Sequence, residues 1–349
     1  MQSIKTAIVG YGYAGRVFHA QLIGATEGLE LYAVSTRDPQ RRQQAAQDLD
    51  VKTYPSLDEL LKDDEVQLVV LATPHDTHKE LAIHCLDAGK HVVSEKIMCL
   101  DTSEADSMIE ASRRNGRMLS VFHNRRWDCG YLTLKRAVAD GLLGDLLVVE
   151  SRVVGWRHPR PDRWRSQRRH GGGSLRDWGA HLIDQALQLI DSPVVSVYCD
   201  MLYTEPKIDV ETSARCCMTF DNGVRYLVET GFISALPRPR WYVRGTRGAF
   251  RKLGLDPQER ALNQGQVNSG LPLPPDERAE VRIETEAGME TRVFETIPGN
   301  WPAYYQNIAD HLLRDAELVV KPEQARRAVA IIETAAESAD EDQVISCRI

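Results

Sequence analysis

Two short segments of the chain carry side chains with the chemistry needed to oxidise an alcohol. Lys96 follows Ser94 and Glu95 at the end of an apolar run, and Asp177 and His181 lie four residues apart where a helix is predicted to begin. A spacing of four places two side chains on one face of a helix. A histidine can accept the hydroxyl proton, a carboxylate can tune it, and a cation can stabilise the developing alkoxide as hydride leaves.

Each of these residues also has a purely structural interpretation when taken alone. A single lysine is usually a surface residue, Asp177 can cap the N-terminus of its helix, and most histidines are structural. The functional interpretation gains weight from a glycine motif, GYGYAG at residues 10–15, which follows the apolar run 6–9.

The glycine motif has the features of a dinucleotide-binding turn. Gly10 permits the tight turn, Gly12 lets a pyrophosphate approach the backbone, and Gly15 lets the following helix lie close to the strand. A helix predicted over 14–26 turns its free N–H groups toward the phosphates, and a predicted strand at 29–35 completes a unit of the expected length. An ordinary glycine turn is the alternative. The cofactor residues expected here are Gly10, Gly12, Tyr13, Ala14 and Gly15.

The end of the second strand indicates which dinucleotide binds. NAD-binding forms of this unit place an acidic residue there, whereas NADP-binding forms use a neutral residue with an arginine nearby. Thr36 occupies that position, and Arg37 and Arg41 can bind a 2′-phosphate. NADP is therefore favoured and NAD stays possible. Asp38 would bind the ribose of NAD if the strand ended later, or would cap the next helix.

Strands and helices alternate through the first third of the chain. Apolar strands separated by amphipathic helices indicate a parallel sheet covered on both faces, which predicts a doubly wound Rossmann domain over residues 1–123. The strands predicted after the first are 29–35, 51–54, 66–73, 90–94 and 118–122, and the helices are one from 39 and those at 57–62, 77–88 and 102–115.

Beyond residue 123 the predicted strands are longer. Apolar and polar residues alternate over 214–220, which is typical of an antiparallel sheet covered on one face. We therefore expect an α+β domain over 124–349 with a large, mostly antiparallel, open-faced sheet. Its predicted strands are 146–154, 194–203, 212–220, 224–232 and 241–245, its helices 127–140, 178–190, 304–313 and 323–338, and its long loop 264–280. The last helix is a candidate to pack back on the first domain.

Composition excludes several classes of protein. The chain has 349 residues, 42% of them hydrophobic, which suits two domains. It shows neither an N-terminal leader nor an apolar run of the ~20 residues that span a bilayer, so we expect a soluble, cytoplasmic protein without a membrane partner. A net charge of −7 argues against a nucleic-acid partner, and seven cysteines without a C-x-x-C pair give no thiolate metal site.

The chain resembles the glucose–fructose oxidoreductase, inositol dehydrogenase and rhizopine-catabolism (Gfo/Idh/MocA) family along nearly its whole length. The matching motifs are GYGYAG at 10–15, ATPHDTH at 72–78, HVVSEK at 91–96, VFHNRRWD at 121–128 and DWGAH at 177–181. The segments HNRRWD and GLDPQE (254–259) look like those of the branch that includes NADP-dependent scyllo-inositol dehydrogenase-like proteins.

This resemblance implies hydride transfer between NADP(H) and a secondary hydroxyl of a cyclic polyol or sugar. It implies that Lys96 contacts cofactor and substrate, that Asp177 orients the pair, and that His181 is the general base. Should His181 be structural, His78 or His123 is the next candidate for the base. Further cofactor-binding residues expected are Ser35, Thr73, Pro74, His75, His78, Glu95, Lys96 and Asn124, and the expected substrate-binding residues are Lys96, Asn124, Arg125, Trp164, Asp177 and His181.

The chain departs from the family pattern at one position, and other functions stay open. The usual Glu-Lys-Pro reads Glu95-Lys96-Ile97 here, which predicts a trans peptide after Lys96. The arginine-rich segment 152–176 is either a solvated loop or part of a pocket for an anionic sugar. A reductase of a ketosugar or dicarbonyl is one alternative function. A non-catalytic dinucleotide sensor is another, since a fungal galactose-pathway repressor shares this fold. A homodimer or homotetramer is expected through the uncovered sheet face.

Overall fold

The computed structural model describes residues 3–267 and 272–349, which form two compact units. The first unit consists of 3–124, 258–267 and 300–326, and the second of 125–257, 272–299 and 327–349. Each unit is therefore assembled from segments that are distant in sequence. No helix within the described ranges has the length and apolar character needed to cross a membrane. The predicted loop at 264–280 lies partly outside the described residues.

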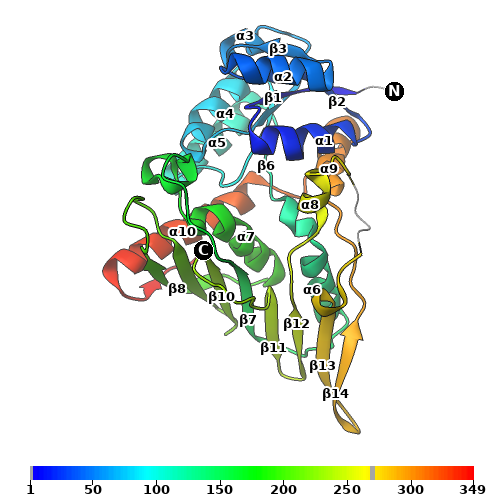
Figure 1. Ribbon diagram of the computed structural model, residues 1–349, viewed down its shortest axis with the longest axis vertical. Coiled ribbons are helices and arrows are strands. Elements are labelled where there is room, and N and C mark those ends of the chain that lie inside the picture. Colours follow the sequence, from blue (N-terminus) through cyan, green and yellow to red (C-terminus); the bar gives the residue numbers. More distant parts are fainter. Residues whose placement is uncertain (1–2, 268–271) are drawn as a thin grey trace. The chain divides into compact units, whose positions relative to one another are not determined.

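The first unit is built on a parallel sheet of six strands in the order β3-β2-β1-β4-β5-β6 (Figure 1). The strands are β1 Ile4–Val9, β2 Leu29–Ser35, β3 Lys52–Tyr54, β4 Leu68–Leu71, β5 His91–Ser94 and β6 Leu119–Val121. The predicted doubly wound sheet is confirmed. The strand predicted at 66–73 is shorter than expected, because Val66 N–H donates to the Asp63 carbonyl in a turn before β4.

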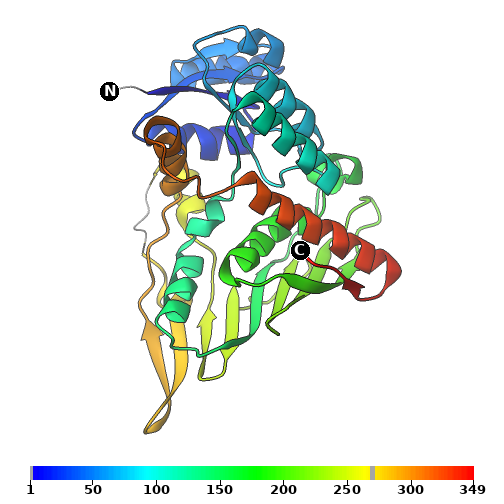
Figure 2. The ribbon, with the colours of Figure 1, turned by 180° about the vertical axis from the view of Figure 1, so that it is seen from behind.

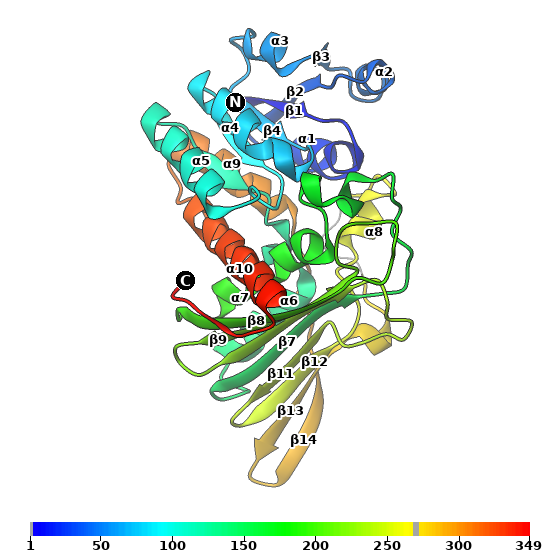
Figure 3. The same ribbon diagram turned by 90° about the vertical axis from the view of Figure 1, so that its left-hand side faces the viewer.

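Helices cover both faces of this sheet. Right-handed crossovers place α1 and α2 on one face and α4 and α5 on the other, and α9 lies beside α1 (Figures 1 and 3). The helices are α1 Ala20–Gly24, α2 Pro39–Leu49, α3 Leu57–Leu61, α4 His78–Asp87, α5 Thr102–Asn115, α8 Gln258–Leu262 and α9 Pro302–Arg314. A π-helical turn, Ala14–His19, joins the glycine motif to α1.

A buried polar chain connects three segments of the first unit. The ring of His19 lies 2.7 Å from the Tyr305 hydroxyl through Nδ1 and 3.1 Å from Glu95 Oε1 through Nε2. The other carboxylate oxygen of Glu95 accepts the backbone N–H of Lys96 at 2.9 Å. Burial alone would raise the pKa of Glu95, but the hydrogen bond from His19 and the charges of His19 and Lys96 lower it to about 2. This series of hydrogen bonds thus fixes the backbone of Lys96 relative to α1 and α9.

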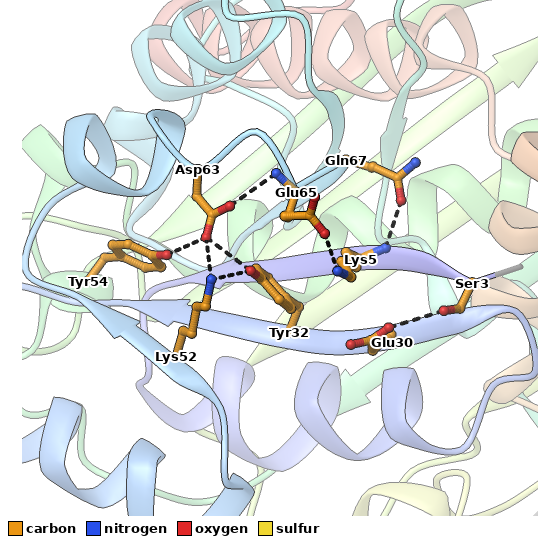
Figure 4. Close-up of polar contacts among 9 residues, drawn as sticks. All are labelled: Ser3, Lys5, Glu30, Tyr32, Lys52, Tyr54, Asp63, Glu65 and Gln67. Carbon is orange, nitrogen blue, oxygen red and sulfur yellow. Dashed lines mark hydrogen bonds and ion pairs between the residues drawn. The ribbon is translucent and has the colours of Figure 1, made fainter.

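A second polar cluster joins β1, β2 and β3 to the turn before β4 (Figure 4). Asp63 Oδ2 accepts hydrogen bonds from the Tyr54 hydroxyl at 2.5 Å, from Lys52 Nζ at 3.0 Å and from the Tyr32 hydroxyl at 3.1 Å. The Tyr54 hydroxyl is the main cause that lowers the pKa of Asp63 below its usual range. This carboxylate therefore holds the outer strands of the sheet together.

The second unit contains a mixed sheet of nine strands in the order β14-β13-β12-β11-β7-β10-β9-β8-β15. Among the described strands of this second sheet, only β7 and β10 form a parallel pair, so the predicted, mostly antiparallel sheet is confirmed. The strands are β7 Leu146–Val154, β8 Val194–Leu202, β9 Ser213–Phe220, β10 Arg225–Gly231, β11 Trp241–Gly245, β12 Gly248–Lys252, β13 Ala279–Thr285, β14 Gly288–Phe294 and β15 Ile345–Ser346.

Helices cover one face of the nine-stranded sheet. They are α6 Cys129–Ala139, α7 Ala180–Leu189 and α10 Pro322–Glu341, the last of which begins in the first unit (Figures 2 and 3). The alternation predicted over 214–220 is confirmed, because Ala214, Cys216, Met218 and Phe220 are buried beneath these helices.

The other face of this sheet carries a row of ion pairs across four strands. Glu229 pairs with Arg215 at 3.5 Å and with Arg152 at 2.9 Å, and Glu150 pairs with Arg152 and with Arg244. Arg152 and Glu229 are themselves nearly buried. The uncovered face therefore carries charges of alternating sign, together with the partly exposed rings of Tyr198 and Tyr242.

We expect Asp63→Asn to lower the free energy of unfolding by about 1–3 kcal/mol at pH 7, because charge-assisted hydrogen bonds to the carboxylate are lost. The pKa of Asp63 is lower in the folded protein than in the unfolded chain, where an aspartate has a pKa of about 3.9. Its ionised carboxylate therefore stabilises the fold above about pH 3.9, and this stabilisation is lost as the pH falls below that value. The difference between the two proteins in urea unfolding should therefore narrow from pH 5 to pH 3. Asp64→Asn, at the exposed neighbouring carboxylate, is the control and should have little effect.

We expect His19→Ala to destabilise the first unit by about 3–5 kcal/mol, because it leaves the buried Glu95 carboxylate without its partner. Tyr305→Phe should cost only about 0.5–1.5 kcal/mol, the value of one hydrogen bond. Adding Glu95→Gln to His19→Ala should recover part of the loss, since it removes the uncompensated charge. Thermal unfolding of these three variants and of Glu95→Gln alone tests this, and strictly additive effects of His19→Ala and Glu95→Gln would contradict it.

Candidate active site

The C-terminal ends of the parallel strands meet along one edge of the first unit's sheet. A row of backbone hydrogen bonds aligns the loops there: Gly10 N–H donates to the Ser35 carbonyl, Ala72 N–H to that of Val9, Glu95 N–H to that of Leu71, and Phe122 N–H to that of Ser94, at 2.8–2.9 Å. Ligands of open parallel sheets bind at this edge. The predicted cofactor segments therefore share one edge, with Asn124 following β6 as a buried residue.

The glycine turn fits the backbone of a dinucleotide. Gly10 has a φ of +98°, and a Cβ there would lie 2.4 Å from the Ala72 carbonyl oxygen. A Cβ on Gly15 would lie 2.1 Å from the Gly10 oxygen, so both positions require glycine. Above Gly12, in contrast, the nearest atom is Arg41 Nη1 at 3.8 Å. Gly12 thus opens the space in which a pyrophosphate can approach the backbone and the first helical turn.

Arginines surround the end of β2. Arg41 extends from the first turn of α2 toward Gly12 and pairs with Asp38 at 3.3 Å. Asp38 itself caps α2, since its Oδ1 accepts the backbone N–H groups of Gln40 and Arg41. Arg37 is exposed and makes no ion pair within the described residues. Asp38 therefore has a structural function here, as the cap of α2.

Tyr13 extends the site to a distant segment. It is 47% exposed, and its hydroxyl bonds to Glu259 at 3.1 Å and accepts from the Asn263 side chain at 2.8 Å. Glu259 lies in α8 and Asn263 directly follows it. The sequence analysis did not predict this helix. The residue after the glycine turn is thereby held in place by a part of the chain almost 250 positions away.

His78 links the 72–78 loop to the loop that carries Lys96. Its Nδ1 lies 2.8 Å from the Ile97 carbonyl and its Nε2 3.0 Å from the Thr73 carbonyl, and burial lowers its pKa. Both ring nitrogens thus face backbone oxygens. The trans peptide predicted after Lys96 is wrong, because the Lys96–Ile97 bond is cis. The general preference for a trans bond before a residue other than proline takes no account of tertiary contacts. Here the Ile97 side chain is buried, and Glu95 and His78 make contacts on either side of the bond.

In the second unit, Asp177 lies at the start of the helix that carries His181. A π-helical turn, Leu175–Gly179, precedes α7, and Asp177 Oδ1 accepts from Arg165 Nε at 3.4 Å. The Arg165 guanidinium also lies 4.4 Å from the Trp164 ring centroid. Four of the predicted substrate residues, Arg125, Trp164, Asp177 and His181, thus belong to the second unit, and Arg165 lies next to two of them.

Arg125 and Trp178 lie next to His181. The Arg125 guanidinium stands 4.2 Å over the Trp178 ring, and the rings of Trp178 and His181 are 6.1 Å apart. His181 is 6% exposed. The next residue in the motif, Arg126, forms a buried bidentate pair with Asp184 on α7 at 2.6 and 2.8 Å. This pair fixes the motif against the helix that presents His181.

Sequence reasoning missed three residues that support these groups. His19 and Tyr305 hold Glu95, and Arg165 pairs with Asp177. A histidine four residues after the last glycine of the motif was visible, but its partners 76 and 286 positions away were not. The arginine-rich segment was noticed as a whole, and nothing in the sequence distinguished Arg165 within it.

The comparisons with known proteins match both units. The model described as "Oxidoreductase family, NAD-binding Rossmann fold" matches residues 4–123, and the GFO/IDH/MocA C-terminal domain matches 131–251. The oxidoreductase YdgJ of Escherichia coli is 37% identical over 97% of this chain and 96% of its own length. The scyllo-inositol 2-dehydrogenase (NADP(+)) IolW of Bacillus subtilis is 33% identical over 99% and 96%.

Solved structures agree with these matches. The structure of the oxidoreductase yvaA from Bacillus subtilis has a TM-score of 0.92 at 29% identity and covers 99% of both chains. That of the YPO2259 oxidoreductase from Yersinia pestis has a TM-score of 0.90 at 34% identity, over 99% of this chain and 97% of that one. A nicotinamide dinucleotide is thus the cofactor, and the chain belongs to the Gfo/Idh/MocA family as an NAD(P)-dependent dehydrogenase acting on CH–OH groups.

Proposed function

We propose that the protein transfers hydride reversibly between NADP(H) and a secondary hydroxyl of a cyclic polyol or sugar. The observation that carries the proposal is the gathering of the glycine turn, the arginines beyond β2 and Lys96 along one edge of a single sheet. The name of the IolW relative, which specifies scyllo-inositol and NADP, gives it further support.

Each residue has a distinct task in this proposal. His181 accepts the hydroxyl proton, Asp177 orients the reacting groups, and the Lys96 ammonium stabilises the developing alkoxide. The bound nicotinamide supplies the hydride acceptor. Asn124, Arg125 and Trp164 contact the substrate. Thr73, Pro74 and His75 adjoin the cofactor, while His78 holds their loop through backbone carbonyls.

The alternatives are distinguished by turnover. A reductase of a ketosugar or dicarbonyl would use the same residues in the opposite direction. A non-catalytic dinucleotide sensor would bind NADP and oxidise none of a panel of polyols and sugars; retention of Lys96, Asp177 and His181 argues against it. We also propose a homodimer or homotetramer formed through the uncovered sheet face, whose alternating charges allow two copies to be complementary.

We expect Arg37→Ala and Arg41→Ala each to raise the Kd for NADP by about 10- to 100-fold and the Kd for NAD far less, because a charge-assisted bond to the 2′-phosphate contributes about 1.5–3 kcal/mol. Calorimetric titration of both dinucleotides measures this. Arg114→Gln, an exposed arginine on α5, controls for net charge. Tighter binding of NAD than of NADP by the unmutated protein would assign the site to NAD.

We expect Lys96→Ala and His181→Ala to lower turnover by about 10²–10⁴-fold while the affinity for NADP changes little, since both groups act in the chemical step. Oxidation by the unmutated enzyme should slow in acid, because only a neutral imidazole accepts the proton, and this slope should vanish in His181→Ala. His84→Ala, at an exposed histidine on α4, is the control. Near-normal turnover of His181→Ala would make His181 structural and direct attention to His123.

A further inference from the structure

A cavity of about 260 Å³ in the second unit lies against Asp177. Its volume is below the range of pockets for drug-sized ligands, so it suits a molecule of monosaccharide size. Basic residues form much of its wall, namely Arg157, His158, Arg160, Arg163 and Arg165. The carboxylates in its lining are Asp177 and Glu211.

Both carboxylates are engaged with the protein itself. Glu211 Oε1 accepts the backbone N–H of Leu175 at 2.8 Å, and Glu211 occupies the space where a Cβ on Gly173 would lie. Burial raises the pKa of Glu211. Asp177 pairs with Arg165. The arginines around the cavity therefore exceed the negative charge available to them inside it.

Arg157 is the arginine best prepared for an external anion. Its guanidinium lies 3.9 Å from the ring centroid of Phe232, and it makes no ion pair within the described part of the chain. Stacking on an aromatic face uses the flat side of the guanidinium and leaves its in-plane N–H donors available. Arg160 and Arg163 pair instead with Asp162, which is exposed and lies outside the lining. Exposed pairs of this kind contribute little and are easily replaced by a ligand.

Gly172 and Gly173 hold the arginine-rich segment against the turn that precedes α7. Gly173 N–H donates to the Arg165 carbonyl at 3.0 Å, and Gly172 N–H donates to the Gln167 carbonyl at 3.1 Å. A Cβ on Gly172 would lie 2.4 Å from the Arg165 oxygen, so another residue would push the segment away. The basic wall is thus fixed relative to Asp177 and does not move as a free loop.

We propose that this cavity binds an oxyanion of the substrate, so that the polyol or sugar oxidised next to Asp177 carries a carboxylate or a phosphate group. The inference rests on the proposed function and narrows its substrate class. Arginines bind both groups through paired N–H donors, which explains why several converge on one small cavity. An uncharged polyol would leave Arg157 without a partner.

The test compares matched neutral and anionic substrates with NADP: glucose with glucuronate and glucose 6-phosphate, and myo-inositol with its monophosphate. We expect kcat/KM to be at least about tenfold higher for one anionic class. Arg157→Gln and Arg163→Gln should raise KM for that class by about 10- to 100-fold and leave kcat and the neutral substrates nearly unchanged. Arg169→Gln, which replaces an arginine of the same segment outside this cavity, should change nothing.

Calorimetric binding of glucuronate and of inorganic phosphate separates this inference from the proposed function. Preference for neutral substrates, with no effect of Arg157→Gln, would overturn the oxyanion site and leave the dehydrogenase intact. Anion binding that depends on Arg157, without turnover of any compound, would overturn the proposed function and leave the anion site standing. Absence of both binding and turnover would overturn both.

Discussion

The contact between His19 and Glu95 is the interaction on which the arrangement of the first unit depends. It lies where three segments meet, and its carboxylate is used at both oxygens, one toward His19 and one toward the Lys96 backbone. A buried carboxylate without such partners would become neutral and would no longer hold the peptide N–H with a charge. The Tyr305 hydroxyl fixes the imidazole from the other side. The position of the Lys96 backbone is thus determined from within the protein.

The sequence predicted those parts of the fold whose signals are local. The bounds of β2, β7, β11 and α5 agree with the predicted ranges, since apolar runs, alternation or helix caps mark them. β14 gave no signal because almost every residue in it is exposed and the alternation is lost. α8 is short, and β15 pairs only two residues with β8. The cis peptide after Lys96 depends on tertiary contacts that no local rule contains.

The two halves of the candidate site were predictable to different degrees for the same reason. The glycine turn is encoded in residues that touch one another along the chain, so its geometry followed from spacing alone. The surroundings of Asp177 depend on a segment folded back through Gly172 and Gly173, and spacing could not select Arg165 from its neighbours. Although the chain as a whole carries a charge of −7, this segment concentrates positive charge. A local field of that sign attracts anions even toward an acidic protein.

The π-helical turns Ala14–His19 and Leu175–Gly179 constrain how the protein can evolve. Each precedes one of the helices that carry the site, and its hydrogen bonds join residues five apart, one more than the four of an α-helix. Loss of a single residue would tighten the turn and rotate the preceding segment by about 100° relative to the helix after it. Asp177 would then leave the side of the helix that His181 occupies, and the glycine turn would lose its alignment with His19. Insertions and deletions in these two segments are therefore far more damaging than substitutions. The number of residues in each segment must be kept, whereas their identities can vary more.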